Sequence, residues 1–152
     1  MRGLYRGFCR NENGTETIVL NGEKIKGDWI YGGLYVNSRI YDIKATHLIM
    51  EVVDGFGMIE PPMAKPYEVI PETVCEAVRE TTDINGKQIF EGDIIRENYY
   101  FCNSTRKVKY NYDHSGFGAY SHGCEQRQMS KEEAEHYEVI GTIFDEQFAE
   151  GV

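Results

Sequence analysis

The chain has few of the residues that cross-link proteins or anchor them in membranes. Its 152 residues include four cysteines, four prolines and one tryptophan, and no apolar run approaches the roughly 20 residues that a transmembrane helix requires. The first residues lack the apolar segment of a secretory signal. We therefore expect a cytoplasmic protein without membrane association. In that compartment we expect free thiols rather than disulfides at Cys9, Cys75, Cys102 and Cys124.

Basic side chains are also scarce. Lysine and arginine total 16 against 25 aspartates and glutamates, which gives a net charge of −9. The excess lies in the second half, where residues 71–152 carry eight basic and sixteen acidic side chains. An acidic surface repels phosphate backbones, so nucleic-acid binding over the whole surface is disfavoured, although a local basic strip remains compatible with it.

Recognisable catalytic and metal-binding motifs are missing. The sequence contains no G-x-S-x-G, P-loop or H-E-x-x-H motif and no C-x-x-C pair. Cys124 lies near several histidines, but without the paired ligand spacing of structural zinc sites; these histidines are His114, His122 and His136. We therefore expect no metal, no cofactor, no catalytic residue and no enzyme activity. A hydrolase with an unrecognised site remains a further hypothesis, which a pocket with two converging polar side chains would favour.

What the chain does have is a compact stretch of turns and short strands at residues 82–96. Asn85-Gly86 predicts a hairpin with a type I′ turn, because both residues tolerate the positive φ that this turn requires. Gly92 and Asp93 predict a second reversal before the apolar pair Ile94-Ile95. We assign Asn85, Gly86, Gly92 and Asp93 as structural turn residues.

The remaining pattern is typical of a β-rich protein. Apolar and aromatic runs predict strands, a second Asn-Gly pair at residues 21–22 predicts another hairpin, and Ser130 with Glu133 predicts the capping box of a short helix over 131–136. Residues 72–82 fit both a helix and a strand, and the helix is preferred. The predicted strands cover residues 4–10, 17–20, 27–36, 47–53, 56–59, 99–102, 106–113 and 138–144.

Basic residues alternate with tyrosines between Arg106 and His114. Such a strand could place Arg106, Lys107 and Lys109 along a phosphate backbone while tyrosines stack on bases. In the alternative interpretation, the tyrosines face the core and the lysines form a solvated face that discourages edge pairing. The candidate nucleic-acid-binding residues are Arg106, Lys107, Lys109, Tyr110 and Tyr112.

Five segments together resemble the YopX family of phage and prophage proteins. They are Tyr5-Arg6-Gly7, the Gly-Asp-Trp-Ile-Tyr-Gly-Gly run at 27–33, Pro-Glu-Thr-Val at 71–74, the hairpin element at 83–94 and the closing strand at 138–144. The resemblance spans nearly the whole chain in order, with about one extra residue before the hairpin. It implies a β-rich fold and a phage or prophage origin. It implies no activity and no catalytic residue, since the biochemical role of the family is not established.

These observations predict a mainly β (α+β) protein with small antiparallel sheets and one or two short helices. We expect a barrel-like, SH3-like β unit in the C-terminal half. The proline-rich segment at 60–66 predicts a linker between an N-terminal β lobe, residues 1–65, and a C-terminal lobe, residues 66–152, which share a core.

Three functional hypotheses follow. The first is a non-enzymatic interaction or self-assembling module that forms a homo-oligomer or binds a phage or host protein. The second is a nucleic-acid-binding protein that uses the strand at 106–114. The third is the hydrolase noted above.

Overall fold

The chain is mainly β-structure. The structure is a computed structural model, and it describes residues 3–37, 46–53, 63–97, 105–111, 116–121 and 127–148. All strand pairings found among these residues are antiparallel, which confirms the expected class. The expected barrel-like closure is wrong, because the described strands form open sheets with edges. The predicted strands at 56–59 and 99–102 lie outside the described residues.

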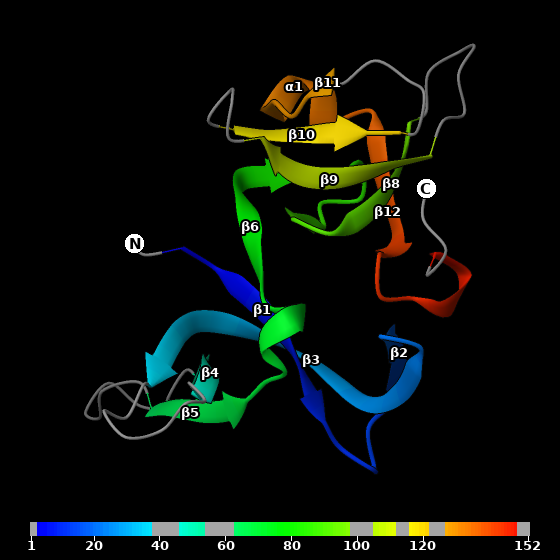
Figure 1. Cartoon of the computed structure of the whole chain (residues 1–152). Helices are drawn as coiled ribbons and strands as arrows, with labels where there is room; N and C mark the ends of the chain where they lie inside the picture. Colours follow the sequence, from blue (N-terminus) through cyan, green and yellow to red (C-terminus); the bar gives the residue numbers. More distant parts are fainter. Residues whose placement is uncertain are drawn as a thin grey trace. The chain divides into compact units, whose positions relative to one another are not determined.

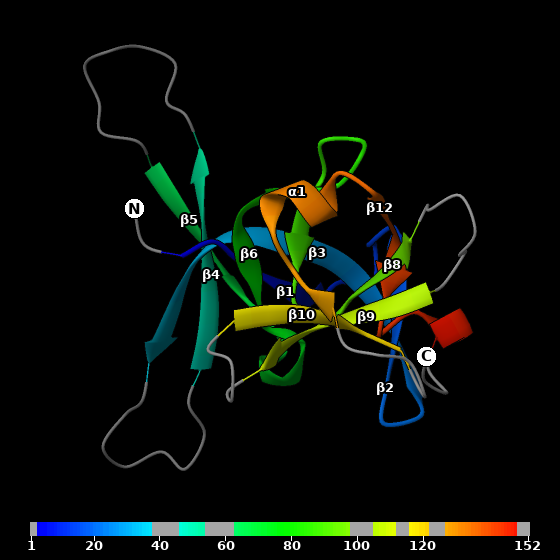
Figure 2. The same cartoon turned by 90° about the horizontal axis from the view of Figure 1, so that it is seen from above.

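The chain divides into two compact units (Figures 1 and 2). One contains Met1–Thr17 and Lys24–Glu76, and the other contains Ile18–Glu23 and Ala77–Val152. This division differs from the predicted boundary between residues 65 and 66, which falls inside strand β5, Met63–Glu68. Pro66 is compatible with β5 because β5 lies at the edge of the described sheet, where proline is tolerated.

The first unit is built on one long strand. β3, Glu23–Asn37, pairs through its first half with β1, Tyr5–Arg10, and through its second half with β4, Thr46–Val53, so its curved ribbon joins two sets of strands (Figure 1). β4 then pairs with β5. Gly27 allows the close approach of β1, since a Cβ at this position would collide with the carbonyl oxygen of Cys9. Phe8 packs edge-to-face against Trp29 with ring centroids 5.3 Å apart.

The Asn21-Gly22 pair forms the hairpin that the sequence predicts. β2, Glu16–Leu20, pairs with β3 across this turn. Asn21 has φ 51° and Gly22 has φ 81°, so both residues take the left-handed conformation of a type I′ turn.

The preference for a helix at 72–82 is wrong. A short 3-10 turn, η1, covers Pro71–Thr73, and strand β6 covers Cys75–Thr82. Strand alternation is hidden in the sequence because the register shifts between Ala77 and Thr82, where Glu80 has φ 55°. An irregularity of this kind, a β-bulge, turns successive side chains out of the period-two pattern.

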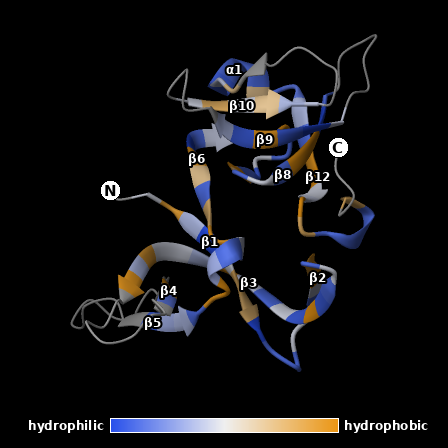
Figure 3. Cartoon of the chain, viewed as in Figure 1, coloured by the Kyte–Doolittle hydropathy of each residue, from blue (hydrophilic) through white to orange (hydrophobic). Residues whose placement is uncertain are grey.

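In the second unit, β6 continues and pairs with β7, Gln88–Phe90. A five-stranded sheet follows in the order β11-β10-β9-β8-β12. Helix α1, Lys131–Ala134, lies beside it (Figures 1 and 2) and consists mostly of hydrophilic residues, while β8 carries hydrophobic residues (Figure 3). The strands are β8 Asp93–Glu97, β9 Thr105–Asn111, β10 Gly116–Tyr120, β11 Arg127–Gln128 and β12 Tyr137–Thr142, and a final 3-10 turn, η2, covers Glu146–Phe148.

One hydrophobic cluster forms the core of the second unit. It combines side chains of β6, β7, the five-stranded sheet and α1. The helix contributes Ala134 and begins as the capping box predicts, since the Ser130 hydroxyl accepts the backbone N–H of Glu133 at 3.2 Å. The cluster consists of Val78, Ile89, Ile95, Val108, Ala119, Ala134 and Tyr137.

Candidate functional site

The turn between β6 and β7 is organised by the side chain of Asp83. Its Oδ1 accepts the backbone N–H groups of Asn85 at 2.9 Å and Lys87 at 2.8 Å. The Asp83 backbone N–H also donates to the Lys87 carbonyl at 2.8 Å. Of the Asn85-Gly86 pair only Gly86 has a left-handed φ, 79°, so the turn is not the type I′ turn expected there. An aspartate that accepts N–H groups two and four residues further on favours this wider turn instead.

The same carboxylate attaches the turn to strand β12. Asp83 Oδ2 accepts the N–H of Val139 at 3.0 Å, and the N–H of Ile84 donates to the Tyr137 carbonyl at 2.9 Å. Asp83 is buried, with 5% of its surface exposed. Ile84, the next residue, is 54% exposed. The turn therefore presents an apolar side chain to solvent on a backbone that is held from two sides.

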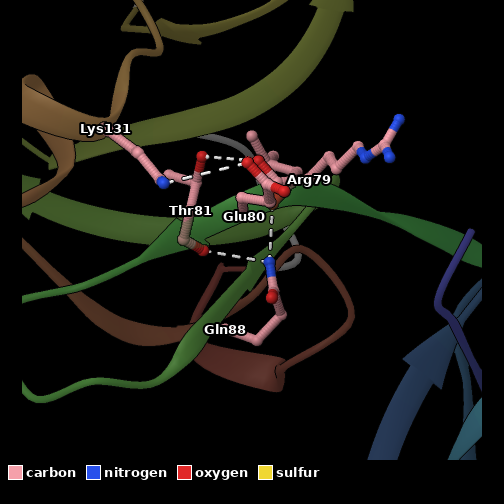
Figure 4. Close-up of polar contacts among 6 residues, drawn as sticks. Arg79, Glu80, Thr81, Gln88 and Lys131 are labelled. Carbon is pink, nitrogen blue, oxygen red and sulfur yellow. Dashed lines mark hydrogen bonds and ion pairs between the residues drawn. The ribbon is translucent and has the colours of Figure 1, made fainter. Parts of the chain in front are cut away.

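The β6 bulge beside this turn is filled by an amide side chain. Nε2 of Gln88 lies within hydrogen-bond distance of the carbonyl oxygens of Val78, at 2.6 Å, and Thr81, at 2.9 Å (Figure 4). These contacts replace strand pairing across the bulge and keep Glu80 in its left-handed conformation, which is unfavourable for a residue with a Cβ. Figure 4 also shows the Lys131 ammonium turned toward Glu80. The two groups lie 3.8 Å apart, and both side chains are largely exposed.

Turn and bulge together border a cavity of about 410 Å³. The described residues that line it include three acidic residues, one lysine, one threonine and the exposed isoleucine. We call this set of residues the Ile84 surface: Glu80, Thr82, Asp83, Ile84, Lys131 and Glu135. All six belong to the second unit.

A second cavity, of about 530 Å³, lies in the first unit beside Cys9 and Glu68. Burial, and then the negative charges of Asp28 and Glu68, raise the pKa of the Cys9 thiol. A raised pKa favours the neutral thiol over the nucleophilic thiolate, so Cys9 is not activated for covalent chemistry. Cys9 and Cys75 form no disulfide among the described residues, and Cys102 and Cys124 lie outside them.

The residues of the predicted basic strip do not share one face. Arg106 is 5% exposed and its Nε lies 3.0 Å from Oε2 of Glu97, which is fully buried. Lys109 is exposed on the opposite face of β9 and Lys107 is half-buried. Tyr110 packs edge-to-face on Phe117 with centroids 5.1 Å apart. In the described part of this strand, Arg106 is thus directed away from the two lysines. Tyr112 lies outside the described residues.

The second predicted reversal lies between β7 and β8, and its aspartate binds one backbone N–H group. Gly92 has φ 83° and its N–H donates to the Val108 carbonyl at 2.8 Å. Asp93 is fully buried, and its Oδ2 accepts the N–H of Phe90 at 2.8 Å. Gly92 and Asp93 therefore both stabilise the backbone conformation at the start of β8.

The described residues contain neither a metal-binding cluster nor a membrane-spanning helix. Across the described residues, no group of three or more His, Cys, Asp or Glu side chains is arranged to hold a metal ion. None of the helices found there is long and apolar enough to span a membrane.

Comparison with known families supplies the family assignment. The model of the family described as YopX protein matches residues 64–147, which is more than half of the chain. The chain belongs to the YopX family. No curated protein matches this YopX-family chain. The match is shorter than the resemblance predicted, since residues 1–63 lie outside it, but it contains every residue of the Ile84 surface.

Most residues of the Ile84 surface were not predicted as a site. The sequence did contain one signal, because Asp-x-Asn-Gly at 83–86 is typical of a turn in which the aspartate side chain accepts backbone N–H groups. Nothing in the local sequence indicated that Lys131 and Glu135 would lie beside Glu80, since these residues come from separate elements.

Proposed function

We propose that this YopX-family protein is a non-enzymatic interaction module that docks on another protein through the Ile84 surface. We further propose that it is encoded by a phage or prophage and acts in the cytoplasm of the bacterial host, either as a homo-oligomer or bound to a phage or host protein. The observation that carries the proposal is the geometry at Ile84. An apolar side chain stands exposed on a backbone fixed by hydrogen bonds to Tyr137 and around Asp83.

A fixed, exposed apolar residue is suited to binding because little conformational entropy is lost when a partner covers it. Anchors of this kind, set beside a concavity and surrounded by polar groups, are typical of binding hot spots. The Ile84 surface has each of these parts: the anchor, a cavity of about 410 Å³ and a charged border.

The structural roles of three buried polar residues support a non-enzymatic function. Asp83 and Asp93 accept backbone N–H groups at turns. Thr73 accepts the N–H of Phe8 at 2.9 Å and donates to the Ile70 carbonyl at 2.6 Å. Each group stabilises a chain reversal or a strand junction, which is a structural use of polar chemistry.

The test compares the wild-type protein with an Ile84→Ser variant. Tagged proteins are captured from bacterial cells that carry the phage, the associated proteins are quantified by mass spectrometry, and the solution mass is measured by light scattering. Val36→Ser is the matched control, because Val36 is an exposed β-branched residue of the other unit, at 46%. We expect Ile84→Ser, and not Val36→Ser, to remove a captured protein or to dissociate an oligomer. A monomeric mass with identical capture by all three proteins would contradict the proposal.

A further inference from the structure

We propose that the Ile84 surface binds a basic segment of a partner protein, with an arginine or lysine side chain in the cavity and an apolar residue of the same segment against Ile84. This inference rests on the proposed docking function and names the chemistry of the partner. It follows from the balance of charge in the cavity, from the position of the one buried carboxylate and from the shape of the surface.

Negative charge dominates the cavity. Of the charged residues in the described part of its lining, Glu80, Asp83 and Glu135 are acidic and only Lys131 is basic. Lys131 lies 3.8 Å from Glu80, so its charge is directed toward that glutamate. Asp83 and Glu135 therefore have no cationic partner in the described lining of the cavity. A cation supplied by a binding partner would balance part of this negative charge.

Asp83 adds a negative charge to the lining of the cavity, and this charge is buried. Its three hydrogen-bond donors are the backbone N–H groups of Asn85, Lys87 and Val139, which stabilise a carboxylate but bring no net charge. With 5% of its surface exposed, this charge is less screened than the charges of exposed glutamates.

Two other kinds of partner fit this charge less well. A nucleic acid would bring phosphates to a surface that already carries an excess of carboxylates. A second copy of the same surface would bring like charges together, which is a strong cost at an interface. A guanidinium or ammonium group has the opposite sign, and arginine adds five N–H donors that can reach carboxylate and hydroxyl oxygens together.

The dimensions of the surface suit a side chain with an apolar stem. The cavity volume of about 410 Å³ lies within the roughly 300–1,000 Å³ that binding pockets occupy. Lysine and arginine bury their methylene groups against apolar neighbours while the charged end stays in a polar setting. Ile84, 54% exposed on the wall of the cavity, supplies such a neighbour, and Thr82 is a polar residue of the same lining.

The experiment titrates the full-length, isotope-labelled protein with two short peptides and follows backbone amide shifts by NMR. The probes are acetyl-Arg-Ile-Arg-amide and its acidic counterpart acetyl-Glu-Ile-Glu-amide. We expect the basic peptide alone to shift the amides of Glu80, Thr82, Ile84 and Glu135. We expect its Kd to rise roughly five- to tenfold in the Glu80→Gln/Glu135→Gln double variant, which removes two attractive charges of modest strength. Glu132→Gln is the matched control, since Glu132 is an exposed glutamate of α1 outside the cavity lining.

The outcomes separate this inference from the proposed function. Equal shifts with both peptides, shifts confined to other residues, or an unchanged Kd in the double variant would overturn the basic-segment inference. Binding of a single-stranded RNA or DNA oligonucleotide at the same residues would overturn it as well. If Ile84→Ser abolishes partner capture while Glu80→Gln/Glu135→Gln does not, the docking function stands and the basic partner is rejected. If neither variant affects capture, both are rejected.

Discussion

The carboxylate of Asp83 and the backbone N–H of Val139 form a 3.0 Å hydrogen bond between residues 56 positions apart in the sequence. This bond, with the Ile84 N–H to Tyr137 carbonyl bond, fastens the β6–β7 turn to strand β12. The other oxygen of the same carboxylate closes the turn itself. One buried side chain therefore fixes both the internal shape of the turn and its position on the sheet, and it thereby fixes the orientation of Ile84.

Removing this carboxylate should destabilise the second unit. Asp83→Ala leaves three backbone N–H groups without their acceptor, and we expect a loss of about 2–4 kcal/mol in the free energy of unfolding, measured by urea denaturation. Asn85→Ala is the control in the same turn, because Asn85 contributes its backbone N–H rather than its side chain to Asp83. If Asp83→Ala is no more destabilising than Asn85→Ala, the organising role of Asp83 is wrong.

Replacing Glu80 by glycine should raise the stability of the protein and lower its affinity for the basic peptide. Its φ of 55° is unfavourable for a residue with a Cβ and costs a glycine little, so we expect Glu80→Gly to stabilise the protein by about 0.5–1 kcal/mol. The same change removes a carboxylate from the Ile84 surface and should weaken the basic peptide. Arg79→Gly, at the neighbouring exposed position outside the left-handed region, should destabilise instead. Thermal unfolding of both variants gives the comparison, and destabilisation by Glu80→Gly would contradict this account of the bulge.

The buried ion pair in the five-stranded sheet gives a third prediction. Arg106→Ala leaves the fully buried Glu97 without the guanidinium at 3.0 Å, and loss of one partner of such a pair costs about 3–5 kcal/mol. We expect chemical denaturation to show a loss of that size for Arg106→Ala and a change below about 0.5 kcal/mol for the exposed Lys109→Ala. Similar, small effects for both variants would show that Arg106 lies at the surface, and would return it to the candidate nucleic-acid strip.

The thiol of Cys9 should titrate at higher pH in the folded chain than in the unfolded one. Burial and the nearby carboxylates of Asp28 and Glu68 raise its pKa above the ordinary 9.0. The folded state then retains the proton more strongly, so the associated stability is complete below the ordinary pKa and is lost as pH rises through the raised value.

Alkylation by iodoacetamide, followed at the Cys9 peptide by mass spectrometry, measures this titration. The midpoint of the rate against pH should lie higher for the native protein than for the protein in urea. A lower midpoint in the native protein would mean that the surroundings of Cys9 activate the thiol.

The sequence predicted the local features and missed those that depend on distant residues. The Asn21-Gly22 turn and the Ser130 cap were predictable, because each is determined by a few adjacent residues. Residues 72–82 were misjudged because the bulge at Glu80 interrupts strand alternation, and the bulge is stabilised by Gln88 from the next strand. The turn at 83–87 differs from type I′ because Asp83 competes for its N–H groups.

The candidate site illustrates the same limit. The basic strip was chosen from alternation along one strand, but Arg106 falls on the Val108 face of that strand and pairs with Glu97 on β8. The Ile84 surface combines the β6–β7 region with α1, which lies some fifty residues later in the chain. Tertiary packing brings the β6–β7 region and α1 together, and no local sequence pattern predicts that contact.

Site-specific photo-cross-linking from position 84 tests the central claim most directly. A photoreactive phenylalanine analogue replaces Ile84 in one strain and the exposed Glu132 in another, and both strains are irradiated in the bacterial host proposed above. We expect a discrete cross-linked protein from position 84 that is absent from position 132 and weakened by Glu80→Gln/Glu135→Gln. If position 84 yields no adduct beyond that of position 132, the Ile84 surface is not a docking site.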